Sequence, residues 1–563
     1  MHVDLLLHNA NILTMDEQHP RAHTMAVHHG RVLALDVDHR AAGITATTTL
    51  DAEGATVTPG FGDAHNHMGW FGLALDEVDL SVAADLDVLY KIVAERADAL
   101  PPDAWVVGSG YDNTRLGGHP HRHELDRVAG GRPVWLKHRS GHVCAVSSEV
   151  LRRTGVLDGA AAVPAGGVVV RDPGGPTGVL EEQAQNLVVE LVVPYPVETL
   201  RTAVGRASQV YASEGLTHVT EAGIGRGWLG KTPLELAAYQ QAREHGELAV
   251  RVQLMPTVST LHDLRGHDDD PMRFGLDLGM RTGFGDDWLR LGPMKIWLDG
   301  SLVARTAAVQ EPFCDHGQGH GYFQDDPGQM HRQLLAAHRG GWRIAAHAIG
   351  DRAVDVALDA FEEARQADPR ADARHRIEHA GITRADQVER MARLGVTPVP
   401  QQRFLYEIGD TMAAALGPER RSLLYRHAAF LRAGLRVPGS SDRPVANGAP
   451  LAGMQSMVER TSSSGDVLGA DERVDAVTAL RAYTVDTAWV AGEEVDRGSL
   501  TPGRLADFVV LGDDVTTIPS GRIAATEVVA TYAGGVCTHG HEALASAADG
   551  YSNPEPDPDQ EHP

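Results

Sequence analysis

Five side chains of types that bind divalent metal ions, together with one lysine, stand at the ends of short segments between residues 65 and 442. In chain order they are two histidines, a lysine, two histidines and an aspartate: His65, His67, Lys295, His347, His379 and Asp442. Most follow apolar or β-branched runs and precede turn residues, which predicts that each lies at the carboxyl end of a strand. Zinc and related metals bind imidazole nitrogen and carboxylate oxygen gathered from distant parts of a chain. The series therefore predicts a catalytic metal centre.

Each member of the series could also have a simpler role when it is taken alone. A His-x-His pair on a strand places both rings on one face, but a pair by itself does not decide metal binding. Lys295 could be an ion-paired lysine, and His347 and His379 could be hydrogen-bonded core histidines. Asp442 lies in SSDRP and could be a helix N-cap. Because all members occur together and in order, metal binding is favoured over these separate roles.

Composition and charge indicate a large soluble protein. The chain has 563 residues, of which 42% are hydrophobic and 22% charged. With 50 basic and 76 acidic residues the formal net charge is −26, which argues against nucleic acid and anionic membranes as partners. We expect a small-molecule substrate. A homodimer is compatible with the sequence, which does not define the oligomeric state.

The cysteines and the N-terminal residues favour a cytoplasmic location. The three cysteines, Cys144, Cys314 and Cys537, form no CxxC pair and suggest no disulfide framework. The N-terminal segment MHVDLLLHNANILTMD lacks the basic head and long apolar stretch of a signal peptide. Cys144, two residues after His142, could be a nucleophile, but a free cysteine in a β-like run is more often a small core residue.

Strand-like segments at both ends flank a centre in which strands and helices alternate. Residues 1–57 and 491–545 read as short strands, and we expect them to form one composite β-sandwich domain. Residues 546–563 are acidic and proline-rich, and we expect them to be disordered.

The centre, residues 58–490, shows repeated strand–helix–strand patterns, such as WRIAAHAIGDRAVDVALDAFEEARQ followed by RHRIEHAG. With metal ligands at strand ends, the leading fold is α/β: a TIM-like (β/α)8 barrel, whose active sites lie at the carboxyl ends of the strands. The interval from His67 to Lys295 is too long for the strands between them, so we expect an insertion at roughly 70–190.

Several longer motifs resemble those of the metal-dependent amidohydrolase superfamily, in particular amidohydrolase family 3 and its N-substituted formamide deformylase-like branch. They run nearly end to end: VTPGFGDAHNH, YDNTRLGGHPHRHELD, RPVWLKHRSGHVCAVSS, GPTGVLEEQA, KIWLDGSLVARTA, HAIGD, RIEHA and GSLTPGRLADFVVL. Any one of these fragments alone is a weak signal, whereas the combination is highly specific.

The resemblance implies one or two divalent metal ions, with zinc expected. His65 and His67 would hold the more buried metal, and His347 and His379 the second. Lys295 would be carboxylated and bridge the two. Carboxylation accounts for this otherwise unusual ligand, since an ammonium group has only donors.

The resemblance also assigns catalytic and substrate-contacting roles. Asp442 would bind metal and act as the general acid/base. His142 is the leading candidate for a catalytic or substrate contact, and the weaker candidates for substrate binding are Tyr111, Asp299 and Arg305.

These observations together predict a hydrolase of carbon–nitrogen bonds other than peptide bonds, acting on an amide or N-formyl compound. Two alternatives stay open: a hydrolase of the same fold that cleaves an ester, a lactone or another non-amide bond, and a catalytically inactive scaffold. Fold alone does not decide between them.

Overall fold

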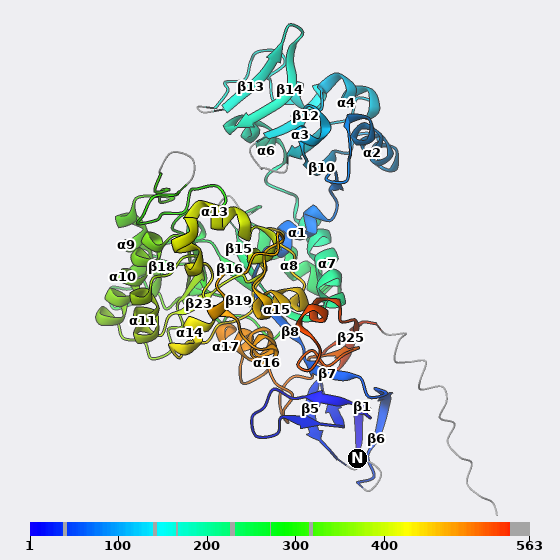
Figure 1. The fold of residues 1–563 in the computed structure, drawn as a ribbon, viewed down its shortest axis with the longest axis vertical. Coiled ribbons are helices and arrows are strands. Elements are labelled where there is room, and N and C mark those ends of the chain that lie inside the picture. The colour runs from blue at the N-terminus through cyan, green and yellow to red at the C-terminus, as the bar shows by residue number, and fades with distance from the viewer. Residues whose placement is uncertain are drawn as a thin grey trace, which may run out of the picture. The chain divides into compact units, whose positions relative to one another are not determined.

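A computed structural model describes residues 1–37, 42–138, 143–164, 167–225, 231–270, 272–314 and 319–540. The chain is mixed α/β and divides into two compact units (Figure 1). One unit comprises Met1–Met68 and Gly205–Pro563, and the other comprises Gly69–Val204. Within the described ranges, no helix combines the length and the apolar character needed to cross a bilayer. The expected tail at 546–563 lies outside the described residues.

Strands from both ends of the chain pair in the first unit. One sheet has the order β26-β25-β24-β7-β2-β3 and the other β5-β4-β1-β6. Their bounds are β1 His2–His8, β2 Asn11–Leu13, β3 Arg21–Ala22, β4 Met25–His28, β5 Arg31–Leu35, β6 Thr45–Asp51, β7 Thr56–Pro59, β24 Phe508–Leu511, β25 Val528–Ala533 and β26 Val536–His539. Leu7 and Val27 from one sheet share a buried core with Val57, Phe508 and others from the second. The strand patterns predicted at both ends are thus confirmed.

The centre of this unit contains two four-stranded sheets in which every neighbouring pair is parallel. Their orders are β19-β16-β15-β8 and β20-β21-β22-β23. The strands span β8 Phe61–Asn66, β15 Leu216–Ile224, β16 Arg251–Pro256, β19 Leu289–Leu291, β20 Met294–Trp297, β21 Ile344–Ala348, β22 Arg376–His379 and β23 Thr397–Val399. A parallel bridge between Thr257 and Lys295 joins the end of β16 to β20.

Amphipathic helices cover these strands, as the sequence pattern predicts. In α10, Asp351–Ala367, residues Val354, Ala357, Leu358 and Phe361 are buried at helical spacing. They share a core with Ile344 of β21 and with other buried residues of this sheet. The helices of this unit include α8 Glu235–Glu244, α9 Pro327–Arg339, α10, α11 Ala385–Leu394, α13 Gly409–Arg420, α15 Pro450–Glu459, α16 Ala476–Arg481 and α17 Thr487–Ala491.

The second unit has its own sheet and its own cores. The strand order is β13-β14-β12-β11-β10-β9, with bounds β9 Val78–Asp79, β10 Val106–Tyr111, β11 Val134–His138, β12 Val143–Val146, β13 Gly167–Asp172 and β14 Gly175–Glu182. Helices α2 Leu86–Ala99, α4 Arg122–Val128, α5 Ser148–Arg153 and α6 Asn186–Val192 also belong to it. Residues of α2, α4, β10 and β11 form one buried cluster. Helices α1 Met68–Ala74 and α7 Val197–Ser213 contain the unit boundaries.

Candidate metal centre

Five of the six predicted ligands lie in, or directly after, parallel strands, although Lys295 is the second residue of its strand and not the last. His65 and His67 stand at the end of β8, Lys295 lies in β20, His347 in β21, and His379 ends β22. The strand predicted before Asp442 is wrong, because residues 435–442 are not assigned to any strand. Pro438, within this segment, has no backbone N–H and cannot donate a hydrogen bond to a neighbouring strand. The segment still follows β8 closely, since the amide of Asp442 donates to the carbonyl oxygen of His65 at 2.7 Å.

His65, His67 and Asp442 converge on one buried point. The Asp442 Oδ1 atom lies 3.3 Å from His65 Nε2 and 3.0 Å from His67 Nε2. One potential ligand atom from each residue lies within 4.8 Å of those of the other two, and all three residues are buried. This spacing allows one ion to contact all three side chains.

Lys295, His347 and His379 surround the same point. Lys295 is fully buried and its Nζ lies 3.4 Å from His65 Nε2. The ring centroid of His379 lies 4.9 Å from that of His65 and 4.5 Å from that of His347. The structure therefore brings all six predicted residues together, although they come from separate parts of the chain.

Buried carboxylates hold the first two histidines in orientations suited to metal binding. His65 Nδ1 contacts the carboxylate of Glu378, which Arg376 also contacts through Nε at 2.5 Å and Nη2 at 2.9 Å. An ionised carboxylate only accepts, so His65 must donate from Nδ1, leaving the Nε2 lone pair toward Asp442. His67 Nδ1 lies 3.6 Å from Glu221 Oε1, and its Nε2 likewise faces Asp442.

Hydrogen bonds orient the other two histidines as well. Gln401 Nε2 donates to the carbonyl oxygen of Val399 at 2.9 Å, so the amide oxygen of Gln401 must face His379. His379 then donates from Nδ1 to Gln401 Oε1 at 2.7 Å and keeps the Nε2 lone pair available. His347 Nε2 donates to the carbonyl oxygen of Gly300 at 3.1 Å, which leaves Nδ1 as its acceptor.

The donor set fits a divalent metal. Metal-binding histidines usually donate their second ring N–H to a carboxylate or carbonyl oxygen, and this arrangement recurs at His65, His347 and His379. With two imidazoles and a carboxylate around one point, the site suits zinc or a similar ion. Lys295 in its charged form would be an unsuitable ligand, whereas a carboxylated Lys295 would supply oxygen.

Burial sets the electrostatics of these groups. Burial lowers the pKa of Lys295 to about 8 and that of His347 to about 3. Burial alone would raise the pKa of Asp442, but the imidazoles of His65 and His67 beside it hold it well below the ordinary value. Lys295 is therefore easier to convert to a neutral amine than an exposed lysine, while Asp442 stays ionised.

The backbone at the site adopts conformations that are uncommon for these residue types. His379 has φ = 71° and Asp442 has φ = 59°, in the left-handed region that few non-glycine residues adopt. In a regular strand, His379 and the preceding Glu378 would point to opposite faces. The left-handed turn at His379 lets both side chains reach His65.

The remaining predicted residues are placed differently. The Asp299 carboxylate is buried and accepts from the amides of Ala308, Ile349 and Gly350 at 2.9, 3.0 and 2.7 Å. Arg305 donates to the carbonyl oxygens of Leu302 and Val303. Their substrate contacts stay predictions.

The other two predicted substrate contacts, Tyr111 and His142, fall within the sequence range of the second unit, Gly69–Val204. Tyr111 is buried there, and its hydroxyl lies 3.0 Å from His119 Nδ1. His142 lies outside the described residues. The thiol of Cys144 is buried with its pKa raised to about 12, so it is not a thiolate near neutral pH.

Sequence reasoning missed the residues that hold the ligands in place: Glu221, Asp299 as a backbone anchor, Arg376, Glu378 and Gln401. Asp63, which the sequence places two residues before His65, also supports the centre, since its carboxylate accepts from the amides of His65 and Ser441 at 3.0 and 3.1 Å. Charged residues two apart in a strand that is buried throughout, such as Arg376 and Glu378, were the available signal, because buried charges are normally paired.

Comparison with known proteins identifies the family of the chain. A model of the family described as "Amidohydrolase family" matches residues 48–539. Protein LONG AFTER FAR-RED 3 of Arabidopsis thaliana is 32% identical, over 94% of this chain and 91% of its own length. N-substituted formamide deformylase of Arthrobacter pascens is 31% identical, over 95% of this chain and 98% of its own length.

Solved structures show the same fold. A crystal structure of an uncharacterized metal-dependent hydrolase from Pyrococcus horikoshii superposes with a TM-score of 0.76 at 25% identity. The match covers 92% of this chain and 99% of that one. The extent of the family match, together with the relatives that span nearly the whole chain, shows that this chain belongs to the amidohydrolase family.

Proposed function

We propose that the chain is a metal-dependent amidohydrolase that cleaves an amide or N-formyl carbon–nitrogen bond. The family supports a hydrolytic function, and one relative of similar length is named for deformylating N-substituted formamides. The observation that carries the proposal is the buried convergence of His65, His67 and Asp442, with Lys295, His347 and His379 around it.

The proposal extends to the fold that holds the centre. The two parallel sheets, the bridge from Thr257 to Lys295 and the hydrogen bonds from β8 to residues 439–442 are what a closed (β/α)8 barrel would contain. We propose this barrel, with the paired sheets of both chain ends as a β-sandwich beside it. The shared core of those two sheets supports the second assignment.

Each residue has a distinct task in the proposed reaction. His65, His67 and Asp442 would hold one ion, His347 and His379 would hold a second where two are present, and a carboxylated Lys295 would supply oxygen to them. A divalent ion lowers the pKa of water and polarises the scissile carbonyl when bound. Asp442 accepts the proton of the attacking water and delivers it to the leaving nitrogen. His142, Tyr111, Asp299 and Arg305 stay proposed substrate contacts.

Asp442→Asn, assayed together with metal content, tests the acid/base role. The amide keeps an oxygen that can face His65 and His67 but cannot accept a proton at neutral pH. We expect turnover per bound metal to fall by about 10²–10⁴-fold, the usual contribution of a general acid–base group. Undiminished turnover in pure, metal-loaded Asp442→Asn protein would remove the role from Asp442.

A substrate screen tests the bond class. Metal-replete protein would be assayed against N-formyl amines and simple amides, with esters and lactones of the same acyl groups as the comparison. Preferential hydrolysis of the nitrogen compounds supports the proposal, and preference for the oxygen compounds overturns the bond assignment. Protein that binds no transition metal after supplementation with zinc and bicarbonate would favour an inactive scaffold.

A further inference from the structure

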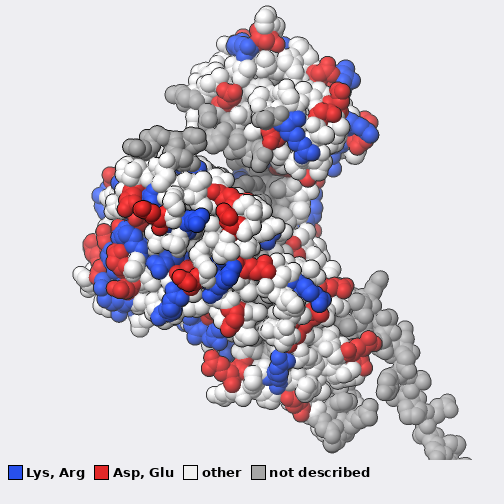
Figure 2. Space-filling view, in the orientation of Figure 1, with Lys and Arg blue, Asp and Glu red and all other residues white. Residues whose placement is uncertain are grey.

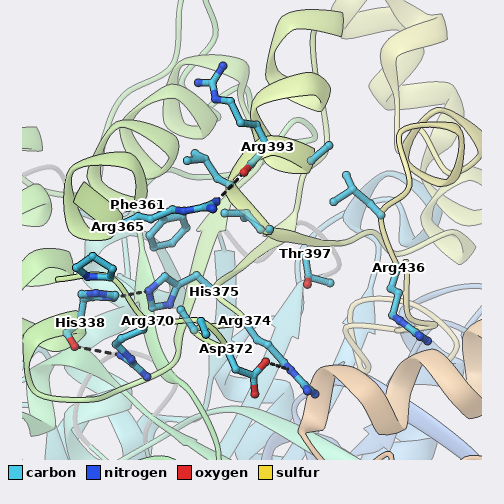
Figure 3. A pocket seen from close by; sticks show the side chains of 18 of the residues that line it. His338, Phe361, Arg365, Arg370, Asp372, Arg374, His375, Arg393, Thr397 and Arg436 are labelled. Atoms are coloured by element: carbon cyan, nitrogen blue, oxygen red, sulfur yellow. Dashed lines mark hydrogen bonds and ion pairs between the residues drawn. The ribbon is translucent and has the colours of Figure 1, made fainter. Parts of the chain in front are cut away.

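A large cavity lies at the opposite ends of β22 and β23 from the metal ligands. Its volume is about 730 Å³, and its walls include residues 369–375 before β22, residues 392–397 before and within β23, and Trp489 of α17. Figure 3 shows side chains that line it, and the lining includes residues of α9, α10, α11 and α17 and of the segments before β22 and β23. The metal centre does not use any of these residues.

The lining of this cavity is strongly basic. It contains five arginines, Arg365, Arg370, Arg374, Arg393 and Arg436, and one acidic residue, Asp372. The whole chain has 50 basic and 76 acidic residues, so a random lining would be acidic. On the face that Figure 2 shows, acidic and basic side chains are interspersed. The excess of arginine is thus a local property of this cavity.

A second cavity of about 390 Å³ extends the basic region. It shares Arg370 and Asp372 with the first and adds three arginines, Arg281, Arg290 and Arg343. Arg343 pairs with Asp372 at 3.2 Å and Arg290 pairs with Glu493 at 2.9 Å, so part of this added charge is already balanced. Burial and the neighbouring positive charge of Arg374 still lower the pKa of Arg343, and a bound anion would offset that repulsion.

Two of the arginines donate hydrogen bonds to neutral backbone carbonyl oxygens, which do not balance their positive charge. Arg370 donates to the carbonyl oxygens of His338, Gly341 and Trp342 at 3.1, 3.1 and 2.9 Å. Arg365 donates to the carbonyl oxygen of Arg393 at 2.6 Å (Figure 3). A carbonyl oxygen is neutral, so these bonds fix the guanidinium groups and leave their positive charge to act on the cavity.

Two more of the arginines are held on an aromatic ring and paired with acids. The guanidinium carbons of Arg374 and Arg436 lie 4.6 and 5.3 Å from the ring of Trp489. Arg374 also binds Glu494 through both terminal nitrogens, and Arg436 binds Asp486 at 3.1 Å. These contacts position planar donor groups at the wall of the cavity. Neither Glu494 nor Asp486 lines the cavity itself.

We propose that this cavity binds a small molecule carrying a phosphate group, with Arg365, Arg370 and Arg436 as its principal ligands. The planar donors of arginine match phosphate oxygens. The volume lies within the range of small-molecule sites. Apolar wall residues, including Ala371, Leu394 and Leu435, would contact the rest of the molecule.

Calorimetric titration of the full-length protein with inorganic phosphate tests the proposal. The ionic strength is held constant, and chloride serves as the control anion. We expect saturable binding that weakens at least tenfold in Arg365→Gln and in Arg436→Gln. Arg426→Gln is the matched control, because Arg426 is partly buried and paired with Glu472 but does not line either cavity. It should bind phosphate as the parent does.

Two further measurements locate the bound phosphate within the protein. Asp442→Asn should bind phosphate unchanged, whereas loss of binding there would place the anion at the metal ligands and overturn the proposal. Phosphate should change the fluorescence of Trp489, and Trp489→Phe should lack that change. Absence of saturable binding, or equal binding in the parent, Arg365→Gln and Arg436→Gln, would also overturn it.

Discussion

Replacing Glu378 by glutamine perturbs the metal centre through a residue that does not touch the metal. Glu378 is fully buried, and its carboxylate contacts Nδ1 of His65 and two nitrogens of Arg376. All three of these nitrogens donate. The amide of Glu378→Gln offers one acceptor atom, and its NH₂ group turns a donor toward either His65 or Arg376. In the first case His65 loses its acceptor outright. In both cases it loses the carboxylate charge that favours the Nδ1–H tautomer and holds the Nε2 lone pair toward the metal site.

The expected loss of metal affinity follows from this geometry. Losing such a supporting carboxylate typically weakens metal binding by about 10–100-fold, which corresponds to about 1.4–2.8 kcal/mol. Stability should fall as well, since removing one member of a buried charge pair costs about 3–5 kcal/mol. The affinity would be measured by competition with a chelator of known strength, at a temperature where the variant stays folded.

A matched variant separates the effect on the metal from the effect on stability. Glu472 is also buried, accepts from the amide of Ala429 at 2.7 Å and pairs with Arg426. Glu472→Gln should lose stability and bind metal with the parent's affinity. If Glu378→Gln also kept that affinity, the reasoning that Glu378 sets the tautomer of His65 would be refuted.

Three further predictions concern Gln401, Glu235 and Gly350. Gln401→Leu removes the acceptor for His379 Nδ1, so metal affinity should fall by about tenfold, measured by the same competition. Burial raises the pKa of Glu235 from 4.5 to about 8; the folded state then binds more protons than the unfolded state between these values, and the free energy of unfolding falls as pH rises. Urea unfolding at pH 5 and pH 8 should show this fall, and Glu235→Gln should reduce it. A Cβ at Gly350 would lie 2.0 Å from the carbonyl oxygen of Ala308, so Gly350→Ala should lower the free energy of unfolding by about 1–3 kcal/mol, whereas an unchanged unfolding curve would show that the loop adjusts freely.

The ligand series was predictable because metal chemistry limits the residue types that can appear at strand ends. Lys295 and His379 stand beside apolar runs, and the two-residue period of β8 relates His65 to His67. The supporting residues were harder to predict, since a glutamine such as Gln401 has no distinctive pattern around it. Its role depends on β22 and β23 being neighbours, which a single sequence does not state.

The missing strand before Asp442 has a related cause. An apolar run followed by turn residues predicts a strand, but strand assignment depends on ladder partners that a sequence does not show. Pro438 cannot donate, and Asp442 adopts a left-handed conformation to direct its side chain toward His65 and His67. Asp442 lies beside His65 and His67 as the sequence predicts although its secondary structure was wrong, because backbone hydrogen bonds to β8 hold its segment in place of a strand ladder.

The energetics of the centre favour an enzyme over an inactive scaffold. With His65 donating to Glu378, its Nε2 lone pair faces the Asp442 carboxylate oxygen 3.3 Å away, so two acceptors meet in a buried place. The cationic group placed beside them is Lys295, whose Nζ lies 3.4 Å from the same nitrogen and whose pKa burial lowers to about 8. Such an arrangement costs stability unless a cation or a proton lies between them. A scaffold gains nothing from that cost, and substitution of one ligand by an apolar residue would remove it. A divalent ion at this point would turn the opposed acceptors His65 and Asp442 into ligands, in line with the proposed function.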